Sequence, residues 1–287
     1  MLDGKKIIEW GKQWFSFWRP RNPRVFEKEK ILSPRLSTSN SFALDEKGEF
    51  YLTDSAVAIV PKNVEMKYLL GVLNSNLLFF IVKHTSPFVQ GRYYSYSRTY
   101  LERLPIKLPQ TSKEKRLADQ IIKKVETIFK YNKQLDELKK KIKKFPEAYF
   151  GGEKLVKVAE ECKLGKDKYS TKLLIIKPVK KNDKELYKLL LTEDDYILFS
   201  SKAMAECALE QLKHKNKIHI DEIYDLELPQ EKDAEKVLKE FLNDKMKVEE
   251  IRKEIKKLER EIDELVYDLY ELDTKDREII EEFLRKF

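Results

Sequence analysis

Carboxylates are missing from one long stretch of an otherwise acid-rich chain. The 287 residues include 50 Asp and Glu, yet the window from Met66 to Leu101 contains none. At the chain average, these 36 residues would hold about six acids. The basic side chains of the window remain, and they are Lys67, Lys83, Arg92 and Arg98, with His84 beside them. An acid-free, aromatic-rich, basic stretch is what a surface that binds a polyanion requires.

Motifs for enzyme chemistry are missing as well. No Gly-rich nucleotide fingerprint, Asp/Asn-Pro-Pro-Tyr methyltransferase tetrad, nucleophile elbow or nuclease constellation occurs. Three isolated histidines and two distant cysteines, Cys162 and Cys207, do not have the spacing of a zinc site. We therefore expect that this chain performs no catalysis alone and holds neither a metal nor a cofactor.

Long apolar runs are also absent. The best membrane candidate, Tyr68–Val82, has 15 residues and is interrupted by Asn74-Ser75-Asn76, whereas a membrane span needs about 20 apolar residues. The scarcity of cysteine and the lack of a signal peptide indicate a reducing compartment. The sequence thus predicts a soluble, cytoplasmic protein without a membrane partner.

Basic charge is concentrated at one end of the chain. Residues 1–110 contain 17 Lys and Arg against 10 Asp and Glu, which is +7 of the formal net charge of +8. The remainder interleaves Lys and Glu, and the overall charged fraction of 38% is typical of long solvent-exposed helices. The partner is therefore expected at the basic head.

The patterns predict an α+β fold with two globular domains and two long helices. The mixed α/β head and a smaller α/β domain are separated by helices, with the expected boundaries 1–110, 111–146, 147–230, 231–272 and 273–287. From Val248 to Leu272 the apolar residues step by three and four, which is a heptad pattern. We expect the two long helices to pair as an antiparallel coiled coil.

Hydrophobic patterning places the elements of both domains. In the head, Tyr68–Val82 is apolar on all sides and predicts one buried helix, followed by a loop over His84–Ser97 and an edge strand over Thr99–Leu108. Other predicted strands of the head are Lys30–Arg35, a hairpin over Phe42–Leu52, and Ala56–Val60. The smaller domain is predicted to hold strands over Leu173–Ile176, Leu186–Leu191, Tyr196–Phe199 and Ile218–Leu228, with a helix over Ala203–Leu212 capped by Ser200 or Ser201.

Several of these segments resemble a known family. The pieces KILSP at 30–34, FALD at 42–45, YLLGVLNS at 68–75 and YLERLPI at 100–106 resemble the TaqI-like C-terminal specificity domain of type II restriction-modification adenine methyltransferases. The helical sequence EREIDELVYDLYEL at 259–272 is similar to the closing helix of the same enzymes. The order of recognition domain, long helix, second domain and long helix also resembles type I specificity subunits.

This resemblance implies a function in restriction-modification. The head would be a target recognition domain for double-stranded DNA, and the chain would be the non-catalytic specificity portion that positions an adenine methyltransferase, with or without a nuclease. That catalytic part would be either a separate subunit or a portion missing from this sequence. S-adenosylmethionine and Mg²⁺ would be needed only there.

Charge and resemblance together select the residues expected to contact DNA. Arginines and lysine would contact phosphates or guanine edges, and tyrosine, serine and histidine would add stacking and hydrogen bonds. The predicted residues are Lys83, His84, Arg92, Tyr93, Tyr94, Tyr96, Ser97 and Arg98, with Arg35 on a second loop. Each tyrosine could equally pack onto the core of the head, and Asn74-Ser75 is expected to cap or kink a helix. Arginines near aromatics in residues 1–27 could also contact phosphate.

A second class of function fits the same charge distribution. The chain could be a structural coiled-coil spacer whose basic head docks an acidic protein. Salt separates the two hypotheses, because binding through several DNA phosphates predicts a steep loss of affinity with rising salt.

Overall fold

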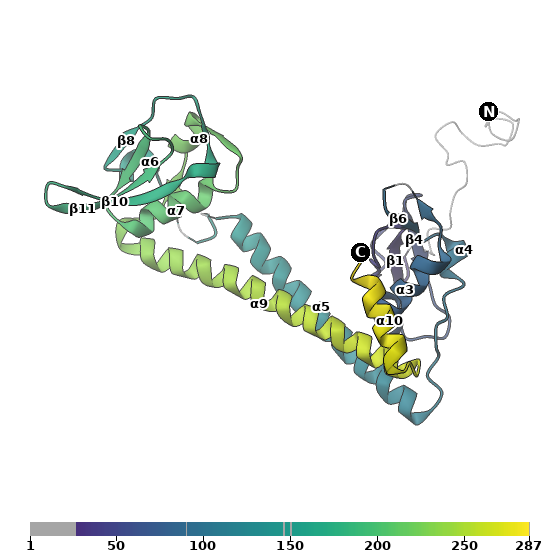
Figure 1. Cartoon of the computed structure of the whole chain (residues 1–287). Coiled ribbons are helices and arrows are strands. Elements are labelled where there is room, and N and C mark those ends of the chain that lie inside the picture. Colours follow the sequence, from purple (N-terminus) through teal and green to yellow (C-terminus); the bar gives the residue numbers. More distant parts are fainter. Residues whose placement is uncertain (1–26, 90, 146, 150, 287) are drawn as a thin grey trace, which may run out of the picture. The chain divides into compact units, whose positions relative to one another are not determined.

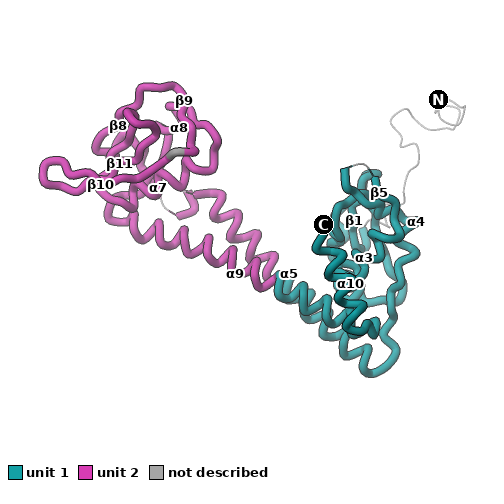
Figure 2. The backbone as a smooth tube through the Cα atoms, viewed as in Figure 1, with its two compact units in different colours: residues 1–129, 256–287 teal, residues 130–255 magenta. Residues whose placement is uncertain are grey.

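The computed structural model describes residues 27–89, 91–145, 147–149 and 151–286. It divides into two compact units, of which unit 1 comprises residues 1–129 and 256–287 and unit 2 comprises residues 130–255 (Figure 2). The long helices α5 (Ser112–Lys143) and α9 (Glu231–Leu269) each contribute to both units. The predicted phosphate contacts within residues 1–26 lie outside the described residues.

Unit 1 contains a three-stranded antiparallel sheet with β1 (Lys30–Pro34) in the middle (Figure 1). Its neighbours are β3 (Ala43–Asp45) and β4 (Ala56–Ile59). The strands predicted at the start of the head and before Pro61 are therefore confirmed. Lys30 and Asp45 face each other across β1 and β3, and they form a buried ion pair.

The hairpin predicted over Phe42–Leu52 is wrong. β3 pairs with β1 instead, and residues 50–52 form no strand. The reason is the carboxylate of Asp45, which accepts hydrogen bonds from the backbone amides of Glu49 (3.0 Å) and Phe50 (3.1 Å). These bonds close a loop on a side chain rather than on a partner strand, a common use of aspartate.

The single buried helix predicted over Tyr68–Val82 is two helices, α2 (Met66–Asn74) and α3 (Asn76–Thr85). Ser75 separates them in extended backbone, and its hydroxyl accepts from the amide of Leu78 at 3.4 Å as the N-cap of α3. The expected capping role of Ser75 is confirmed. In the described part of the chain no single helix is long and apolar enough to cross a membrane. The α2–α3 pair would suffice by length and composition, but it is bent by 64°.

The loop predicted over His84–Ser97 contains a hairpin. β5 (Phe88–Val89) pairs with β6 (Tyr93–Ser95), and β6 pairs with β2 (Leu36–Ser37), which gives a second three-stranded antiparallel sheet. These strands have two or three residues each, which is too short for an alternating pattern to be visible in the sequence.

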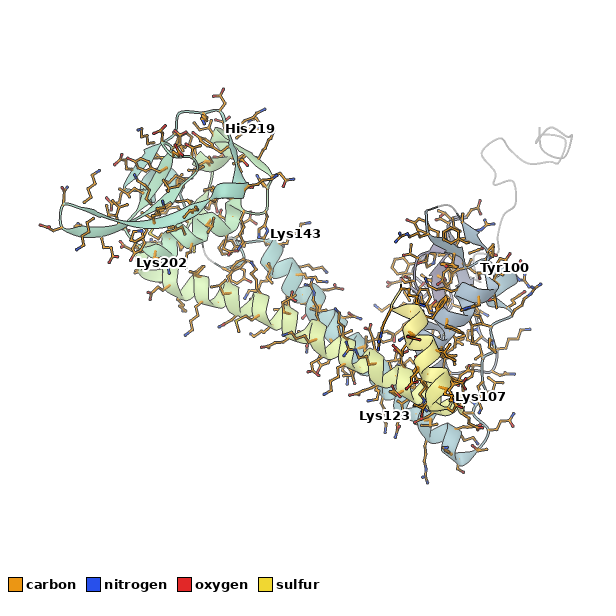
Figure 3. All side chains as sticks on the ribbon, in the orientation of Figure 1. Tyr100, Lys107, Lys123, Lys143, Lys202 and His219 are labelled. Atoms are coloured by element: carbon orange, nitrogen blue, oxygen red, sulfur yellow. The ribbon has the colours of Figure 1, made fainter. Side chains whose placement is uncertain are left out.

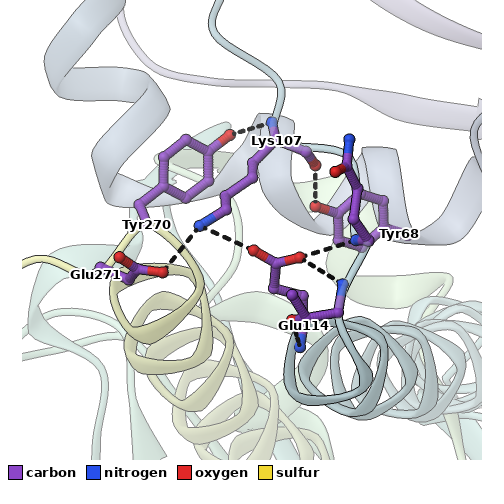
Figure 4. Close-up of polar contacts among 7 residues, drawn as sticks. Tyr68, Lys107, Glu114, Tyr270 and Glu271 are labelled. Atoms are coloured by element: carbon purple, nitrogen blue, oxygen red, sulfur yellow. Dashed lines mark hydrogen bonds and ion pairs between the residues drawn. The ribbon is translucent and has the colours of Figure 1, made fainter.

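The edge strand predicted over Thr99–Leu108 is also wrong. The segment begins with the short helix α4 (Arg98–Leu101) and continues as extended chain without a strand partner. Tyrosine side chains take the place of a neighbouring strand: the Tyr68 hydroxyl donates to the carbonyl of Lys107 at 2.5 Å, and the Tyr270 hydroxyl accepts from the amide of Lys107 at 3.0 Å (Figure 4). Two segments that carry the family resemblance thus meet at Lys107, which directly follows the third.

The carboxylate of Glu114 connects the start of α5 to Lys107. Glu114 accepts hydrogen bonds from the amides of Gln110 (2.8 Å) and Thr111 (2.9 Å), and Thr111 Oγ1 accepts from the amide of Glu114 at 3.2 Å. This is a capping box. The bonds from the two amides, together with the ammonium of Lys107 at 3.2 Å, lower the pKa of Glu114 to about 2 (Figure 4).

The core of unit 1 is closely packed at Gly71, where α2 meets α5 and the end of α9. A Cβ atom at this position would lie 2.6 Å from Ile121 Cγ2, 3.1 Å from Val125 Cγ2 and 3.8 Å from Ile262 Cγ2. The first distance is shorter than any normal contact, and Ile121 and Val125 are themselves buried. A glycine is therefore required here for close helix packing rather than for its backbone freedom.

We predict that Gly71→Ala lowers the free energy of unfolding by about 1–2 kcal/mol, because overpacking outweighs the better helix propensity of alanine. Urea denaturation followed by far-UV circular dichroism would measure the change. In an Ile121→Ala background the same substitution should cost clearly less, since the clashing methyl group is gone and only the tight contact with Val125 remains. Equal costs in both backgrounds would contradict the close approach.

Unit 2 is built around a four-stranded antiparallel sheet in the order β10 (Ile175–Lys181), β11 (Lys184–Leu190), β12 (Tyr196–Phe199) and β8 (Glu161–Lys163). Helix α7 (Lys202–Leu212) packs on it, and the hydroxyl of the N-cap residue Ser201 accepts from the amide of Met204. The predicted helix with its serine cap is confirmed, as is the strand over Tyr196–Phe199. Short elements complete the unit, namely β7 (Glu153–Lys154), α6 (Leu155–Val158), β9 (Lys168–Ser170), the 3₁₀ helix η2 (Thr171–Leu173), β13 (Lys217–His219), α8 (Ile220–Tyr224) and β14 (Glu227–Leu228).

The single strand predicted over Ile218–Leu228 is three elements, β13, α8 and β14. Glu222 explains the interruption, since its carboxylate accepts the amide of His219 at 3.2 Å and closes the first turn of α8. The apolar residues Ile218, Ile223 and Leu228 are all fully buried. Their burial, rather than a strand period, accounts for the hydrophobic pattern that suggested a strand.

The long helices run antiparallel within each unit. In unit 1, Lys124 of α5 pairs with Glu261 of α9. In unit 2, Lys141 lies 2.8 Å from Asp244, while Leu138, one turn earlier on α5, lines a shared groove with Ile251, further along α9. The final helix α10 (Thr274–Leu284) packs on α3 in unit 1. The α+β class, the two mixed domains and the pairing of the long helices are as the sequence predicted.

Candidate nucleic-acid interface

The β2-β6-β5 sheet presents one face to solvent. Residues opposite each other in register share a face of a sheet, so Leu36 with Ser95 and Val89 with Tyr93 lie on the same side. Leu36 and Tyr93 are 46% and 44% exposed, and Val89 and Ser95 are half-buried. We call these four residues the outer face.

The other side of the sheet packs inward and contains two residues that were expected to contact DNA. Tyr94 is buried, and the Nζ of Lys83 lies 4.8 Å from the centre of its ring and 4.6 Å from that of Phe79. Burial lowers the pKa of Lys83. The prediction that Lys83 contacts phosphate is corrected, because its side chain is 8% exposed and packs between aromatic rings. Tyr94 likewise supports the sheet from below.

Tyr96 is fully buried, so its predicted contact with DNA is also corrected. Its hydroxyl donates to Asn40 Oδ1 at 2.8 Å, and its ring meets that of Phe42 edge to face at 5.8 Å. Asn40 Nδ2 in turn donates to the carbonyl of Leu73 at 2.7 Å, at the end of α2. Tyr96 therefore fixes the end of the hairpin to the break between α2 and α3, and burial raises its pKa.

The turn between β5 and β6 holds Arg92 in an unusual backbone conformation. Gly91 and Arg92 have φ of +83° and +69°. A non-glycine residue in this left-handed region costs about 1–2 kcal/mol. A Cβ at Gly91 would lie 3.3 Å from the ring of Tyr93, which covers the turn. Arg92 is exposed, and strain of this kind occurs preferentially at functional sites.

Two further arginines flank the sheet. Arg35 lies between β1 and β2, where its amide donates to Ser55 (2.8 Å) and its carbonyl accepts from Tyr96 (2.9 Å), while its side chain is exposed. Arg98 begins α4, and its side chain is 82% exposed although Nε donates to Glu102 Oε1 at 2.6 Å. An exposed pair of this kind is worth at most about 1 kcal/mol and is readily exchanged for another anion.

Ser97 and His84 have mainly structural contacts. Ser97 is half-buried at the N-cap position of α4, and its carbonyl accepts from the amides of Tyr100 (3.0 Å) and Leu101 (3.1 Å). His84 is exposed, but its ring lies 4.5 Å from that of Phe283 on α10, and Nδ1 is 2.8 Å from the carbonyl of Phe80. Its position favours a role in packing α10 onto α3.

Of the nine predicted residues, four combine exposure with suitable chemistry, and they are Arg35, Arg92, Tyr93 and Arg98. Leu36 belongs to the same surface and is not among the predicted residues, although it is 46% exposed. Phe88 is 63% exposed but lies on the other side of the sheet, opposite Tyr94 in register and with its ring 5.7 Å from that of Tyr94. We call Arg35, Leu36, Arg92, Tyr93 and Arg98 the arginine surface, and the acid Glu102 follows it in sequence.

No group of three or more His, Cys, Asp or Glu that could hold a metal ion is present among the described residues. The titratable groups of the arginine surface lack the cluster of convergent acids or nucleophiles that a hydrolytic site needs. Its chemistry is that of hydrogen-bond donors, positive charge and aromatic rings, which suits a nucleic acid backbone and base edges.

Two comparisons with known proteins find similarity to this chain. A solved structure with a detectable likeness is the S subunit of a type I restriction-modification system from M. genitalium, 12% identical, aligned over 84% of this chain and 83% of that chain with a TM-score of 0.37. Residues 2–106 match the family model of the TaqI-like C-terminal specificity domain, and the resemblance that these residues carry in the sequence is confirmed over this span.

Proposed function

We propose that unit 1 recognises a specific sequence of double-stranded DNA for a restriction-modification system, and that the arginine surface makes the contact. The observation that supports it most strongly is the position of Arg92. It is exposed at the tip of a hairpin, within a stretch free of carboxylates and within the span that matches a specificity domain. A short hairpin with an arginine at its tip is narrow enough to enter the major groove.

Each exposed group of the surface has a part in this proposal. Arg92 and Arg98 present the forked donors that match phosphate oxygens or the O6 and N7 of guanine. Tyr93 supplies an aromatic face and a hydroxyl beside the turn. Arg35, whose backbone is bonded to that of Tyr96, contributes a further positive charge near the base of the hairpin. Lys83, Tyr94 and Tyr96 hold the hairpin in place from below.

The rest of the proposed activity belongs to a partner. Target recognition by itself changes no covalent bond, so the chain would position an adenine methyltransferase, with or without a nuclease, as a separate subunit or an adjoining domain. S-adenosylmethionine and Mg²⁺ would be bound by that part, in the cytoplasm. The chain's own contribution is affinity and specificity for DNA.

Selection of bound sequences from random duplexes tests this function. The full chain is incubated with the pool at low salt, with and without the cognate methyltransferase, and the bound duplexes are sequenced. We expect one enriched sequence, with an affinity that falls steeply as salt rises. A chain that binds no duplex with or without the methyltransferase, and that instead retains an acidic protein, would favour the spacer hypothesis over DNA recognition.

A further inference from the structure

The four-stranded sheet of unit 2 has two faces of different chemistry. One face carries Leu189, Ile197 and Phe199, which are fully buried in the core that includes α7. The strand register places alternate residues on the opposite face. That face carries five lysines, which we call the lysine face: Lys163, Lys177, Lys181, Lys184 and Lys188.

Like charges lie directly opposite each other on the lysine face. Lys177 pairs in register with Lys188, and Lys181 with Lys184. Directly opposed like charges destabilise a sheet. On the other side of the same hairpin, Lys180 is opposite Glu185, which is a favourable arrangement. Repulsion between paired lysines therefore occurs on only one face of this hairpin.

Few acids offset this charge. Within these four strands the lysine face holds one carboxylate, Glu161, so the sum of strand charges on it is 5 − 1 = +4. Glu161 is bonded to Lys181 at 2.7 Å and to the hydroxyl of Tyr196 at 2.6 Å. Lys188 lies 3.6 Å from the centre of the Tyr196 ring. Lys163, Lys177 and Lys184 are exposed.

Protection of a sheet edge does not account for the pattern. Lysines and prolines on an edge strand prevent pairing with other chains, and Pro178 already removes a donor from the edge strand β10. Lys184 and Lys188, however, lie on the interior strand β11, where a lysine protects no edge. The positive charge therefore lies on three of the four strands, β10, β11 and β8, rather than along one edge.

The hairpin that carries four of these lysines is stiff. Its turn residues, Asn182 and Asp183, have φ of +51° and +58°, which is the two-residue geometry that matches strand twist. Seven register pairs join β10 and β11, whose turn projects from unit 2 (Figure 1). The lysines are thus held in fixed rows.

We propose that the lysine face is a second nucleic-acid contact of this chain, which binds the phosphate backbone of duplex DNA without regard to sequence. Lysine ammonium groups bind phosphate as point charges, and they lack the planar, forked donors with which arginine recognises a base edge. An anionic backbone would replace the repulsion between the paired lysines with attraction. The inference rests on the proposed function, to which it adds affinity that does not depend on the target sequence.

The test compares two triple variants of the full chain. Lys163→Gln/Lys177→Gln/Lys184→Gln removes charge from the lysine face. Lys180→Gln/Lys202→Gln/Lys217→Gln removes the same charge elsewhere in unit 2, where Lys217 begins β13 and Lys202 begins α7 (Figure 3). Dissociation constants are measured by fluorescence anisotropy over a salt series, on the selected target and on a scrambled duplex. Circular dichroism melting checks folding.

We expect the lysine-face variant to bind both duplexes more weakly by a similar factor, with the slope of log affinity against log salt reduced by about 2–3. Its melting temperature should stay equal or rise, because repulsion is relieved. The control variant should keep the parent slope. Equal slopes for both variants would overturn the inference, as would binding of the parent to polyglutamate but to neither duplex. Failure of the proposed function would appear differently, as a parent chain that does not distinguish target from scrambled DNA.

Discussion

The double variant Arg92→Asn/Arg98→Gln should bind the selected DNA target at least about 30-fold more weakly than the parent, since each arginine contact to a base or phosphate is worth about 1–3 kcal/mol. Asparagine is chosen at position 92 because it tolerates the positive φ of the turn. Glutamine at position 98 keeps a helix former in α4. Fluorescence anisotropy with the full chain would measure the affinity.

The stability of unit 1 should hardly change in this variant. Arg92 is exposed, and its replacement relieves backbone strain rather than adding any. The ion pair between Arg98 and Glu102 is exposed on both sides, with side chains 82% and 59% accessible, so its loss costs about 0.5 kcal/mol or less. A large drop in melting temperature would show that the arginines are structural and would contradict the proposal.

Arg92→Lys distinguishes a contact of Arg92 with a guanine edge from a contact with phosphate. A lysine keeps the charge but lacks the planar fork. If Arg92 reads guanine, the lysine variant should lose discrimination between the target and a duplex altered at one base pair. If it contacts phosphate, affinity for both duplexes should remain nearly unchanged. Arg116→Gln, on the exposed side of α5, is the matched control for loss of one charge in unit 1.

The division of the acid-free stretch into supporting and exposed residues could not be read from the sequence. Composition and resemblance located the stretch, and Arg92 and Arg98 within it are exposed. Lys83 and Tyr96 have the same polar ends as exposed residues, but both have long apolar portions that can be buried. The contacts of Lys83 with the rings of Phe79 and Tyr94, and the hydrogen bond from Tyr96 to Asn40, show that both residues point inward.

Local propensity was a sound guide for helices and strands long enough to show a hydrophobic period, and it missed the two- and three-residue strands β2, β5 and β6. β1, β4 and β12, together with α5, α7 and α9, all follow from hydrophobic period and caps. It failed where side chains from distant residues satisfy the backbone. The extended segment at Lys107 is held by Tyr68 and Tyr270, 39 and 163 residues away in sequence. No short window of sequence contains such a contact, so the alternating pattern there predicts a strand that does not form.

The largest loss of stability is expected from Asp45→Ala, about 3–5 kcal/mol for unit 1, because it leaves a buried ammonium without its carboxylate. Lys30 and Asp45 have side chains only 0% and 2% exposed, and they face each other across β1 and β3. The same carboxylate accepts the amides of Glu49 and Phe50. Hydrogen exchange at the amides of β1 and β3 would report the loss locally.

A double substitution and the pH dependence of stability show whether loss of the ion pair causes this destabilisation. Lys30→Met/Asp45→Leu should cost less than the sum of the single substitutions, since removing both charges also removes their cost of burial. The pH dependence gives an independent check. Burial alone would raise the pKa of Asp45, but the hydrogen bonds from Lys30 and from the amides of Phe50 and Glu49 outweigh it and lower the pKa to about 2, from 3.8.

Because the folded pKa lies below the unfolded one, the carboxylate contributes its stability above pH 4 and loses it as the pH falls from about 4 to about 2. The shift corresponds to about 2 kcal/mol. Asp45→Asn should remove this part of the acid sensitivity of unit 1, so that the difference in unfolding free energy between parent and variant shrinks towards pH 2. A difference that is constant from pH 6 to pH 2 would mean that Asp45 is held by its backbone donors as a neutral group, and that Lys30 neither lowers its pKa nor depends on its charge.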